Sequence, residues 1–172
     1  MWHYIRTEVD LPLPINEVFS FFSKAENLER ITPKSLGFKI MTPLPIHMEQ
    51  DTVIDYQVKL NGLPMGWRTL IAVWNPPYEF VDEQIKGPYR TWIHRHSFKS
   101  LDGGGTRITD YVRYELPFTP LGDLVHPLIK MQLTGIFHHR NWTIPALLLG
   151  DRADEAREVS FEMGSGIWTG KS

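Results

Sequence analysis

The segment Trp92-Ile93-His94-Arg95-His96-Ser97-Phe98 carries two histidines and two large aromatic residues at alternate positions. In a β-strand, residues i, i+2 and i+4 point to the same face of the sheet. The residues that share one face here are Trp92, His94, His96 and Phe98. A face with two such aromatic side chains is expected to be shielded from water. The alternation therefore predicts a strand whose imidazoles point into the protein, toward a mainly apolar space that also contains polar groups. A ligand cavity has this character.

Further segments with a period of two lie on both sides of this strand. The expected strands are 2–10, 36–43, 52–60, 65–75, 78–86, 89–100 and 105–117. The turns between the last five are expected at Asn61-Gly62, Asn75-Pro76-Pro77, Gly87-Pro88 and Asp102-Gly103-Gly104-Gly105. Six successive strands joined by short turns predict an antiparallel meander, and strand 2–10 makes a seven-stranded sheet.

Helical spacing appears before and after the meander. After Pro14, apolar residues recur three and four positions apart from Ile15 to Phe22, which predicts an amphipathic helix. A short second helix is expected to end at Pro33. The longest helix is expected after Pro117, with Thr119 as its N-cap and Pro120 at its first position. An apolar side of this helix starts with Leu121, Leu124, Val125 and Leu128, and Pro127 should kink or split it.

The composition fits a single globular domain. The chain has 172 residues, of which 42% are hydrophobic and 22% charged, with a formal net charge of -2 and no cysteine. These values favour a folded protein without disulfides and exclude a basic surface for nucleic acid. Without a signal peptide pattern or a membrane-spanning apolar run, a cytoplasmic protein that does not insert into membranes is expected. We expect one domain over residues 1–150, and residues 151–172 as an extension outside the core that is free to move.

A strand, two short helices, six antiparallel strands and a long C-terminal helix describe an α+β fold in which a curved sheet buries one face against that helix. This arrangement resembles the helix-grip superfamily known as SRPBCC, which includes START lipid-transfer domains, birch pollen allergen relatives and polyketide cyclase/dehydrase-like proteins. The resemblance covers about residues 1–148. Its specific residues are Phe80-Val81-Asp82-Glu83-Gln84, Gly87-Pro88-Tyr89-Arg90, Trp92, His94, His96, Phe98, Asp110, Val112, Tyr114, Pro117-Phe118 and Leu121-Gly122. It implies a cavity for a small apolar or aromatic molecule, and for this bacterial ligand-binding branch no settled activity.

The turns also predict which strand residues face each other. A three-residue loop at Asp102-Gly103-Gly104 sets His96 opposite Asp110 and Trp92 opposite Tyr114. A three-residue loop at Gly87-Pro88-Tyr89 would set Asp82 opposite His94 and Gln84 opposite Trp92, whereas a two-residue turn would point Glu83 inward. The side chains predicted to bind the ligand are Tyr56, Gln84, Trp92, His94, His96, Phe98, Asp110 and Tyr114. Strand 65–75 has two possible inner faces. Either the alternate residues from Trp67 to Val73 or those from Arg68 to Trp74 point inward.

Three functions are compatible with this pocket. The leading prediction is a protein that binds a small hydrophobic molecule, in which the imidazoles and carboxylates orient the polar end of the ligand or form a satisfied polar network. The alternatives are a cyclase or dehydratase that uses His94 or His96 with Asp82 or Asp110 as acid-base catalysts, and a protein-interaction module. No cofactor is expected. The His-x-His pair could hold a metal with a carboxylate, but the sequence shows no further spaced ligand, so no metal is predicted. The oligomeric state stays open.

Overall fold

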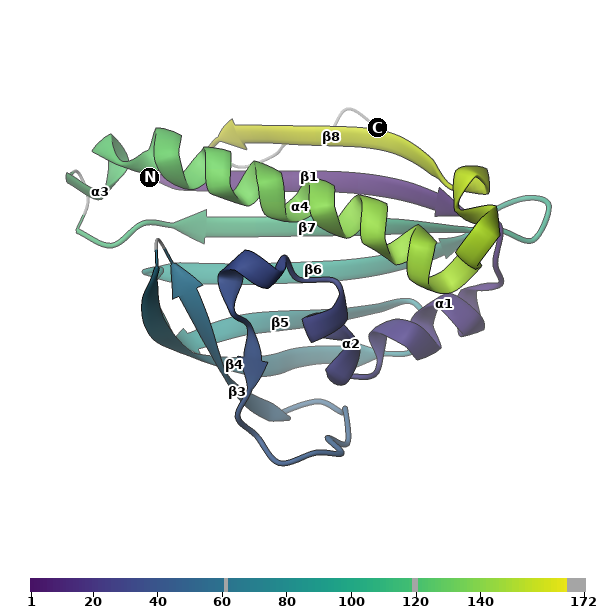
Figure 1. The fold of residues 1–172 in the computed structure, drawn as a ribbon, viewed down its shortest axis with the longest axis horizontal. Helices are drawn as coiled ribbons and strands as arrows, with labels where there is room; N and C mark the ends of the chain where they lie inside the picture. The colour runs from purple at the N-terminus through teal and green to yellow at the C-terminus, as the bar shows by residue number, and fades with distance from the viewer. Residues whose placement is uncertain (61, 119–120, 167–172) are drawn as a thin grey trace.

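One antiparallel sheet forms the body of the protein in this computed structural model, which describes residues 1–60, 62–118 and 121–166 (Figure 1). Its strands are β1 (Trp2–Leu11), β2 (Lys39–Ile40), β3 (Val53–Leu60), β4 (Leu63–Asn75), β5 (Glu79–Lys86), β6 (Thr91–Ser100), β7 (Thr106–Glu115) and β8 (Arg157–Ser165). They lie side by side in the order β2-β3-β4-β5-β6-β7-β1-β8. The predicted meander is confirmed, because β2 to β7 are neighbours in chain order.

The helices cover one face of this sheet. They are α1 (Ile15–Phe22), α2 (Glu26–Arg30), η1 (Lys34–Leu36), α3 (Leu121–Leu124), α4 (His126–Leu149) and η2 (Gly150–Glu155). Helix α4 runs across the sheet, and α1 and α2 lie on the same side of it (Figure 1). The predicted α+β arrangement of a sheet around a long C-terminal helix is therefore confirmed.

The eighth strand corrects the prediction for the end of the chain. Residues 151–172 were expected outside the core, but Arg157–Ser165 pairs antiparallel with β1 and extends the sheet beyond the seven expected strands. The sequence pattern did not reveal this strand, because residues 151–158 are polar and the outer side of β8 is solvated at the edge of the sheet. Arg157 and Asn141 tie the segment down through ion-pair and hydrogen-bond contacts with Asp10 and Glu158.

The expected long helix is split rather than kinked. Helix α3 ends at Leu124, and α4 begins at His126 with Pro127 in its first turn, where a missing backbone N–H costs no helical hydrogen bond. The predicted N-cap Thr119 and first helical residue Pro120 lie outside the described residues.

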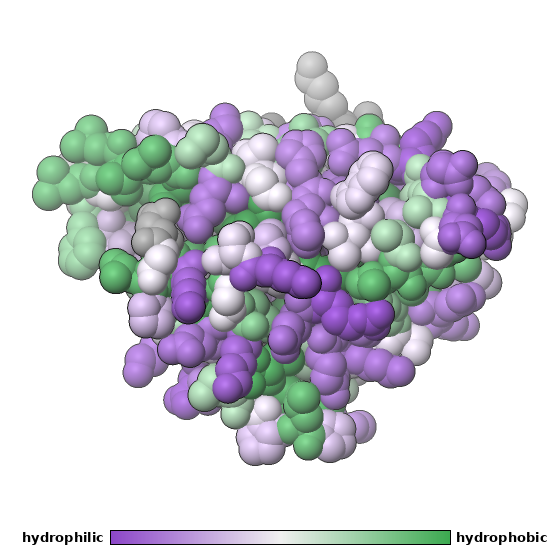
Figure 2. All heavy atoms as spheres, in the orientation of Figure 1, coloured by the Kyte–Doolittle hydropathy of each residue, from purple (hydrophilic) through white to green (hydrophobic). Residues whose placement is uncertain are grey.

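Apolar side chains of α3 and of the start of α4 lie on the surface rather than in the core. The exposed set comprises Phe118, Leu121, Leu124, Val125, Leu128 and Met131. Figure 2 shows hydrophobic residues gathered at this end of the molecule. Among the described residues, no helix has both the length and the apolar character needed to cross a membrane.

The core is divided into three clusters of buried side chains. One joins α1 to β6 through Phe19, Phe22 and Phe98, and a second joins α4 to β1 and β7 through residues such as Phe137 and Tyr114. A third lies on β3. Members of all three clusters, such as Phe22, Leu133 and Ile54, also line a cavity between the sheet and the helices.

Candidate functional site

A cavity of about 180 Å³ lies between the sheet and the helices. Strands β3 to β6, the segment around α2, and α4 all contribute to its wall, and most of the lining side chains are apolar, among them Val58, Trp67, Leu133 and Phe137. A concave, mainly apolar space with a few polar groups is the usual form of a small-molecule site.

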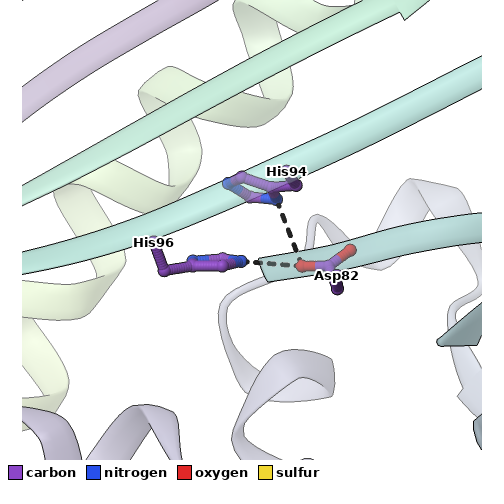
Figure 3. Close-up of side chains that lie close together, drawn as sticks. All are labelled: Asp82, His94 and His96. Carbon is purple, nitrogen blue, oxygen red and sulfur yellow. Dashed lines mark hydrogen bonds and ion pairs between the residues drawn. The ribbon is translucent and has the colours of Figure 1, made fainter. Parts of the chain in front are cut away.

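One polar group in the wall consists of Asp82, His94, His96 and Arg140. Strand register brings the first three together, since Asp82 pairs with His94 across β5 and β6, and His96 pairs with Asp110 across β6 and β7. Both predicted registers are confirmed at these positions, although the β5–β6 ladder ends at Glu83↔Ile93, before Gln84. Figure 3 shows Asp82 facing both imidazoles.

Each imidazole lies between two carboxylates. The Nε2 atom of His94 lies 2.7 Å from Asp110 Oδ1, and its Nδ1 atom lies 3.8 Å from Asp82 Oδ2. The Nε2 atom of His96 lies 2.8 Å from Asp82 Oδ2. Its Nδ1 atom lies 2.9 Å from Asp110 Oδ1, close enough for an ion pair but not aligned for a hydrogen bond. Asp110 thus holds both rings from behind, and Asp82 faces them from the side of the cavity.

The charges of these groups are set by burial and by one another. Burial and the neighbouring His96 lower the pKa of His94 despite its contact with Asp110. Burial alone would also lower the pKa of His96, but the adjoining carboxylates of Asp110 and Asp82 outweigh it and raise that pKa. Burial disfavours the charge on Asp110, but Arg140 and the two histidines hold the pKa of Asp110 well below its usual range. His96 therefore carries the proton more readily than His94.

Arg140 is a site residue that the sequence analysis missed. It projects from α4, is 4% exposed, and its Nη2 atom lies 3.3 Å from Asp110 Oδ1. Its Nε atom has no hydrogen-bond partner among the described residues. The signal was present in the helical spacing, because Arg140 is the charged member of a buried stripe that includes Leu133, Phe137 and Ile144. A charged residue on such a stripe needs a buried partner.

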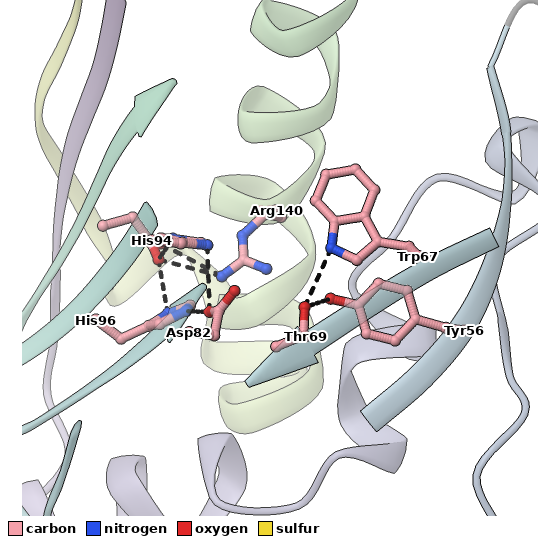
Figure 4. Close-up of polar contacts among 8 residues, drawn as sticks. Tyr56, Trp67, Thr69, Asp82, His94, His96 and Arg140 are labelled. Atoms are coloured by element: carbon pink, nitrogen blue, oxygen red, sulfur yellow. Dashed lines mark hydrogen bonds and ion pairs between the residues drawn. The ribbon is translucent and has the colours of Figure 1, made fainter. Parts of the chain in front are cut away.

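A second polar group lies on the opposite wall (Figure 4). The Tyr56 hydroxyl lies 2.6 Å from Thr69 Oγ1, and the Trp67 indole N–H donates to the same oxygen at 3.1 Å. Burial, together with the negative charge of Asp82, raises the pKa of Tyr56, so its hydroxyl keeps its proton. The cavity thus has hydrogen-bonding groups at two sides and apolar walls between them.

The predicted ligand-binding residues divide into two groups. Tyr56, Trp92, His94 and His96 line the cavity. The other four, which are not part of its lining, are Gln84, Phe98, Asp110 and Tyr114. Each of these has another contact that explains its position.

Gln84 binds the backbone of Tyr89 through its side-chain amide, which closes the β5–β6 turn. Phe98 packs against Phe19 and Phe22 in the core. Asp110 lies behind the two histidines. The hydroxyl of Tyr114 lies 3.1 Å from Nε2 of His126, at the start of α4. These four residues share the inner face of the sheet with the histidines, as predicted, but this face extends beyond the cavity.

One set of donor atoms among the described residues could hold a metal ion. Single ligand atoms of Asp82, His94 and His96 all lie within 4.8 Å of one another. The carboxylate considered beside the His-x-His pair in the sequence is Asp82 on the neighbouring strand, and the further ligand that the sequence lacked is not part of this set.

Comparison with known proteins places the chain in a family. Residues 11–136 match the family described as polyketide cyclase/dehydrase and lipid transport, and the chain belongs to this family. This confirms the resemblance found in the sequence. No curated protein matches the sequence closely enough to count as a relative.

Solved structures with the same fold come from plants and bacteria. Truncated norcoclaurine synthase from Thalictrum flavum has a TM-score of 0.66 and 15% identity, over 87% of this chain and 95% of that one. The protein TTHA0849 from Thermus thermophilus has a TM-score of 0.64 and 16% identity, over 84% and 98%. A START superfamily protein from Mycobacterium smegmatis has a TM-score of 0.59 and 16% identity, over 89% and 98%. At these identities the likeness establishes the fold alone.

Proposed function

We propose that this protein binds a small hydrophobic or aromatic molecule in the cavity between the sheet and α4. The observation that carries the proposal is a mainly apolar cavity of about 180 Å³ with polar groups at two sides. Burying the apolar surface of a ligand there contributes roughly 25 cal/mol per Å² removed from water. The family match agrees with this function, since its description includes lipid transport. A cytoplasmic location and the lack of a nucleic-acid partner stay predictions from composition.

The polar wall gives the ligand an orientation. Arg140 on α4 and Tyr56 on β3 both line the cavity, and Figure 4 shows the polar groups that each of them belongs to. An acceptor oxygen of the ligand beside the Arg140 guanidinium would gain a charge-assisted hydrogen bond. The aromatic rings of Trp67 and Trp92, which meet edge to face, offer a surface for a flat ligand.

A fluorescence titration with N-phenyl-1-naphthylamine, a neutral apolar dye, tests the proposal. We expect saturable binding of one dye molecule per protein. Val58→Trp fills the cavity from β3 and should weaken dye binding at least tenfold. Val53→Trp is the matched control, because Val53 lies on the same strand but is 42% exposed, against 7% for Val58. Equal affinities of the two variants would refute the cavity as the binding site.

Native mass spectrometry identifies the natural ligand more directly. Protein purified without denaturation should retain a small molecule, which unfolding should release. The same spectra report the oligomeric state. The Val58→Trp variant should carry less of this molecule than the Val53→Trp control.

A second candidate function is acid-base catalysis of a cyclisation or dehydration. The supporting observation is His94, which lines the cavity and contacts Asp110 through Nε2, while its Nδ1 faces Asp82. Norcoclaurine synthase, an enzyme by name, has the same fold. In an enzyme, His96→Gln should lower turnover while dye affinity is kept. A screen of polyketone substrates that finds no turnover in the wild-type protein would leave binding as the function.

A further inference from the structure

The two imidazoles of the cavity wall are arranged so that each ring has one nitrogen toward Asp110 and one toward Asp82. The outer atoms, His94 Nε2 and His96 Nδ1, lie 2.7 and 2.9 Å from the same oxygen of Asp110. A neutral imidazole has one N–H donor and one acceptor nitrogen. When both outer nitrogens carry the ring protons, both inner nitrogens present lone pairs.

The two inner nitrogens both lie near one carboxylate oxygen. His94 Nδ1 and His96 Nε2 lie 3.8 and 2.8 Å from Asp82 Oδ2, and the three atoms lie within 4.8 Å of one another. Three acceptors that converge in a buried position need a cation between them. A proton on His96 fills this need in the geometry seen here, and a metal ion would fill it more fully.

We propose that Asp82, His94 and His96 form a binding site for a first-row transition-metal dication such as Zn²⁺. Two imidazoles and one carboxylate suit zinc and its neighbours rather than Mg²⁺ or Ca²⁺, which prefer oxygen ligands alone. This inference goes beyond the proposed ligand binding and does not depend on it.

The rearrangement that zinc binding requires of the Asp82 carboxyl is small. Zinc bonds of about 2.0–2.1 Å in a tetrahedral site set neighbouring ligand atoms about 3.3 Å apart. The Asp82 oxygen is now 2.8 Å from one nitrogen and 3.8 Å from the other. A shift of the Asp82 carboxyl by about half an ångström, from His96 toward His94, makes the two distances equal, and rotation about the terminal side-chain bond of Asp is soft. The two ligand nitrogens, which lie within 4.8 Å of one another, must also approach to about 3.3 Å through rotation of the imidazole side chains.

The surroundings have the features of a site with an open coordination position. Asp110 accepts a hydrogen bond from Nε2 of His94 and lies 2.9 Å from Nδ1 of His96, and a carboxylate behind histidine ligands orients them and increases their basicity. All three proposed ligands line the cavity, so the remaining position faces the space for the small molecule. With neutral imidazoles, Asp82, Asp110 and Arg140 sum to one negative charge. Binding of a dication would give the group a net charge of +1, which a hydroxide or an anionic oxygen of a bound molecule would balance.

Zinc affinity is the first test. Full-length protein, stripped with a chelator, is titrated with Zn²⁺ in competition with a chromophoric chelator. We expect one equivalent to bind with micromolar or tighter affinity. Asp110→Asn should weaken binding by about 10–100-fold, as expected for a residue that positions metal ligands. Asp82→Asn and His96→Gln should weaken binding further, because each removes a ligand.

His47→Gln is the matched control. His47 lies 3.9 Å from Glu49 on the surface, so it is a histidine beside a carboxylate outside the cavity. We expect this substitution to leave zinc affinity unchanged. Binding that is lost in His47→Gln and kept in Asp82→Asn would overturn the proposal, as would a wild-type protein that binds no equivalent of zinc in the micromolar range.

Side-chain ¹⁵N NMR of the histidines tests the site without any substitution, so a variant that fails to fold cannot obscure the result. One equivalent of Zn²⁺ should shift His94 Nδ1 and His96 Nε2 into the range of metal-bound nitrogens, while their other nitrogens keep protons. The two rings would then bind through different atoms. Unchanged signals from both histidines at one equivalent would refute the site.

Discussion

Replacing Asp110 with asparagine tests whether the buried group behind the cavity wall is held together by charge. The Asp110 carboxylate is 2% exposed and contacts His94, His96 and Arg140. Asparagine has nearly the same shape but no negative charge, so the Arg140 guanidinium loses its nearest counter-charge. The substitution creates no large cavity, and its effect reports the electrostatic contribution.

The expected loss of stability is large. Breaking a buried ion pair by removing one partner costs about 3–5 kcal/mol, because the other charge stays buried without compensation. For a chain of this size each kcal/mol lowers Tm by about 2–4 °C, so Tm should fall by roughly 6–20 °C. Asp82, which also feels the charge of Arg140, would compensate part of the loss and favours the lower end.

Urea unfolding followed by tryptophan fluorescence measures this loss. Asp55→Asn is the matched control, since Asp55 pairs with Arg68 at 2.7 Å on the surface, where the pair is screened by water. We expect Asp55→Asn to have a much smaller effect. Adding Arg140→Met to Asp110→Asn should recover part of the stability, because the uncompensated cation is then gone. Equal losses for Asp110→Asn and Asp55→Asn would refute the account of a buried charged group.

Three further predictions concern α4, the sheet edge and pH. Leu133→Ala should cost about 2–5 kcal/mol in urea unfolding and Leu128→Ala less than about 0.5, because Leu133 is 3% and Leu128 62% exposed; similar losses would contradict this packing of α4. Deleting residues 157–172 removes β8, and should lower Tm and cause self-association in light scattering, because the edge of β1 becomes unpaired; an unchanged monomer would show that β8 is dispensable. The hydrogen bond from Arg107 holds the pKa of Asp10 below its ordinary value, despite partial burial. Asp10 therefore stabilises the fold above the unfolded pKa of about 4, and this stability is lost as pH falls through the lower folded pKa. Urea unfolding of wild type and Asp10→Asn should differ at pH 7 and converge at acidic pH, and a constant difference would contradict the assignment.

Turn residues made the central register predictable. The three-residue loop at Asp102-Gly103-Gly104 has only one pairing in which both flanking strands keep their apolar residues inside, and the structure has that pairing, with His96 opposite Asp110. The positive φ angles of Gly103 and Gly104 show why glycine is needed there.

Which residues of β4 point inward could not be predicted, because the strand is irregular. Trp67, Thr69 and Ile71 follow one alternation toward the cavity, whereas Trp74 packs on Phe80 from the other alternation. A β-bulge between Ile71 and Val73 changes the phase, so both competing patterns are correct for part of the strand. Sequence periodicity assumes a constant phase and cannot show where it shifts.

The candidate site was only partly predictable for a similar reason. Alternation identified the inner face of β6, but it could not show which inner side chains meet the cavity and which meet a helix. Phe98 shares that face with His94, yet α1 covers it, while His94 lies in the cavity wall opposite α4. Arg140 comes from an element far along the chain, and its contact with Asp110 depends on how α4 crosses the sheet.

The position of a small apolar molecule bound between the sheet and α4 can be measured directly. Nuclear Overhauser effects between N-phenyl-1-naphthylamine and isotope-labelled methyl groups of the protein measure its position. We expect contacts to the methyl groups of Ile54, Val58 and Leu133, which line the cavity. Contacts confined to the exposed Leu121, Leu124 and Leu128 would contradict this expectation, because the dye would then lie on the outer surface of α3 and α4.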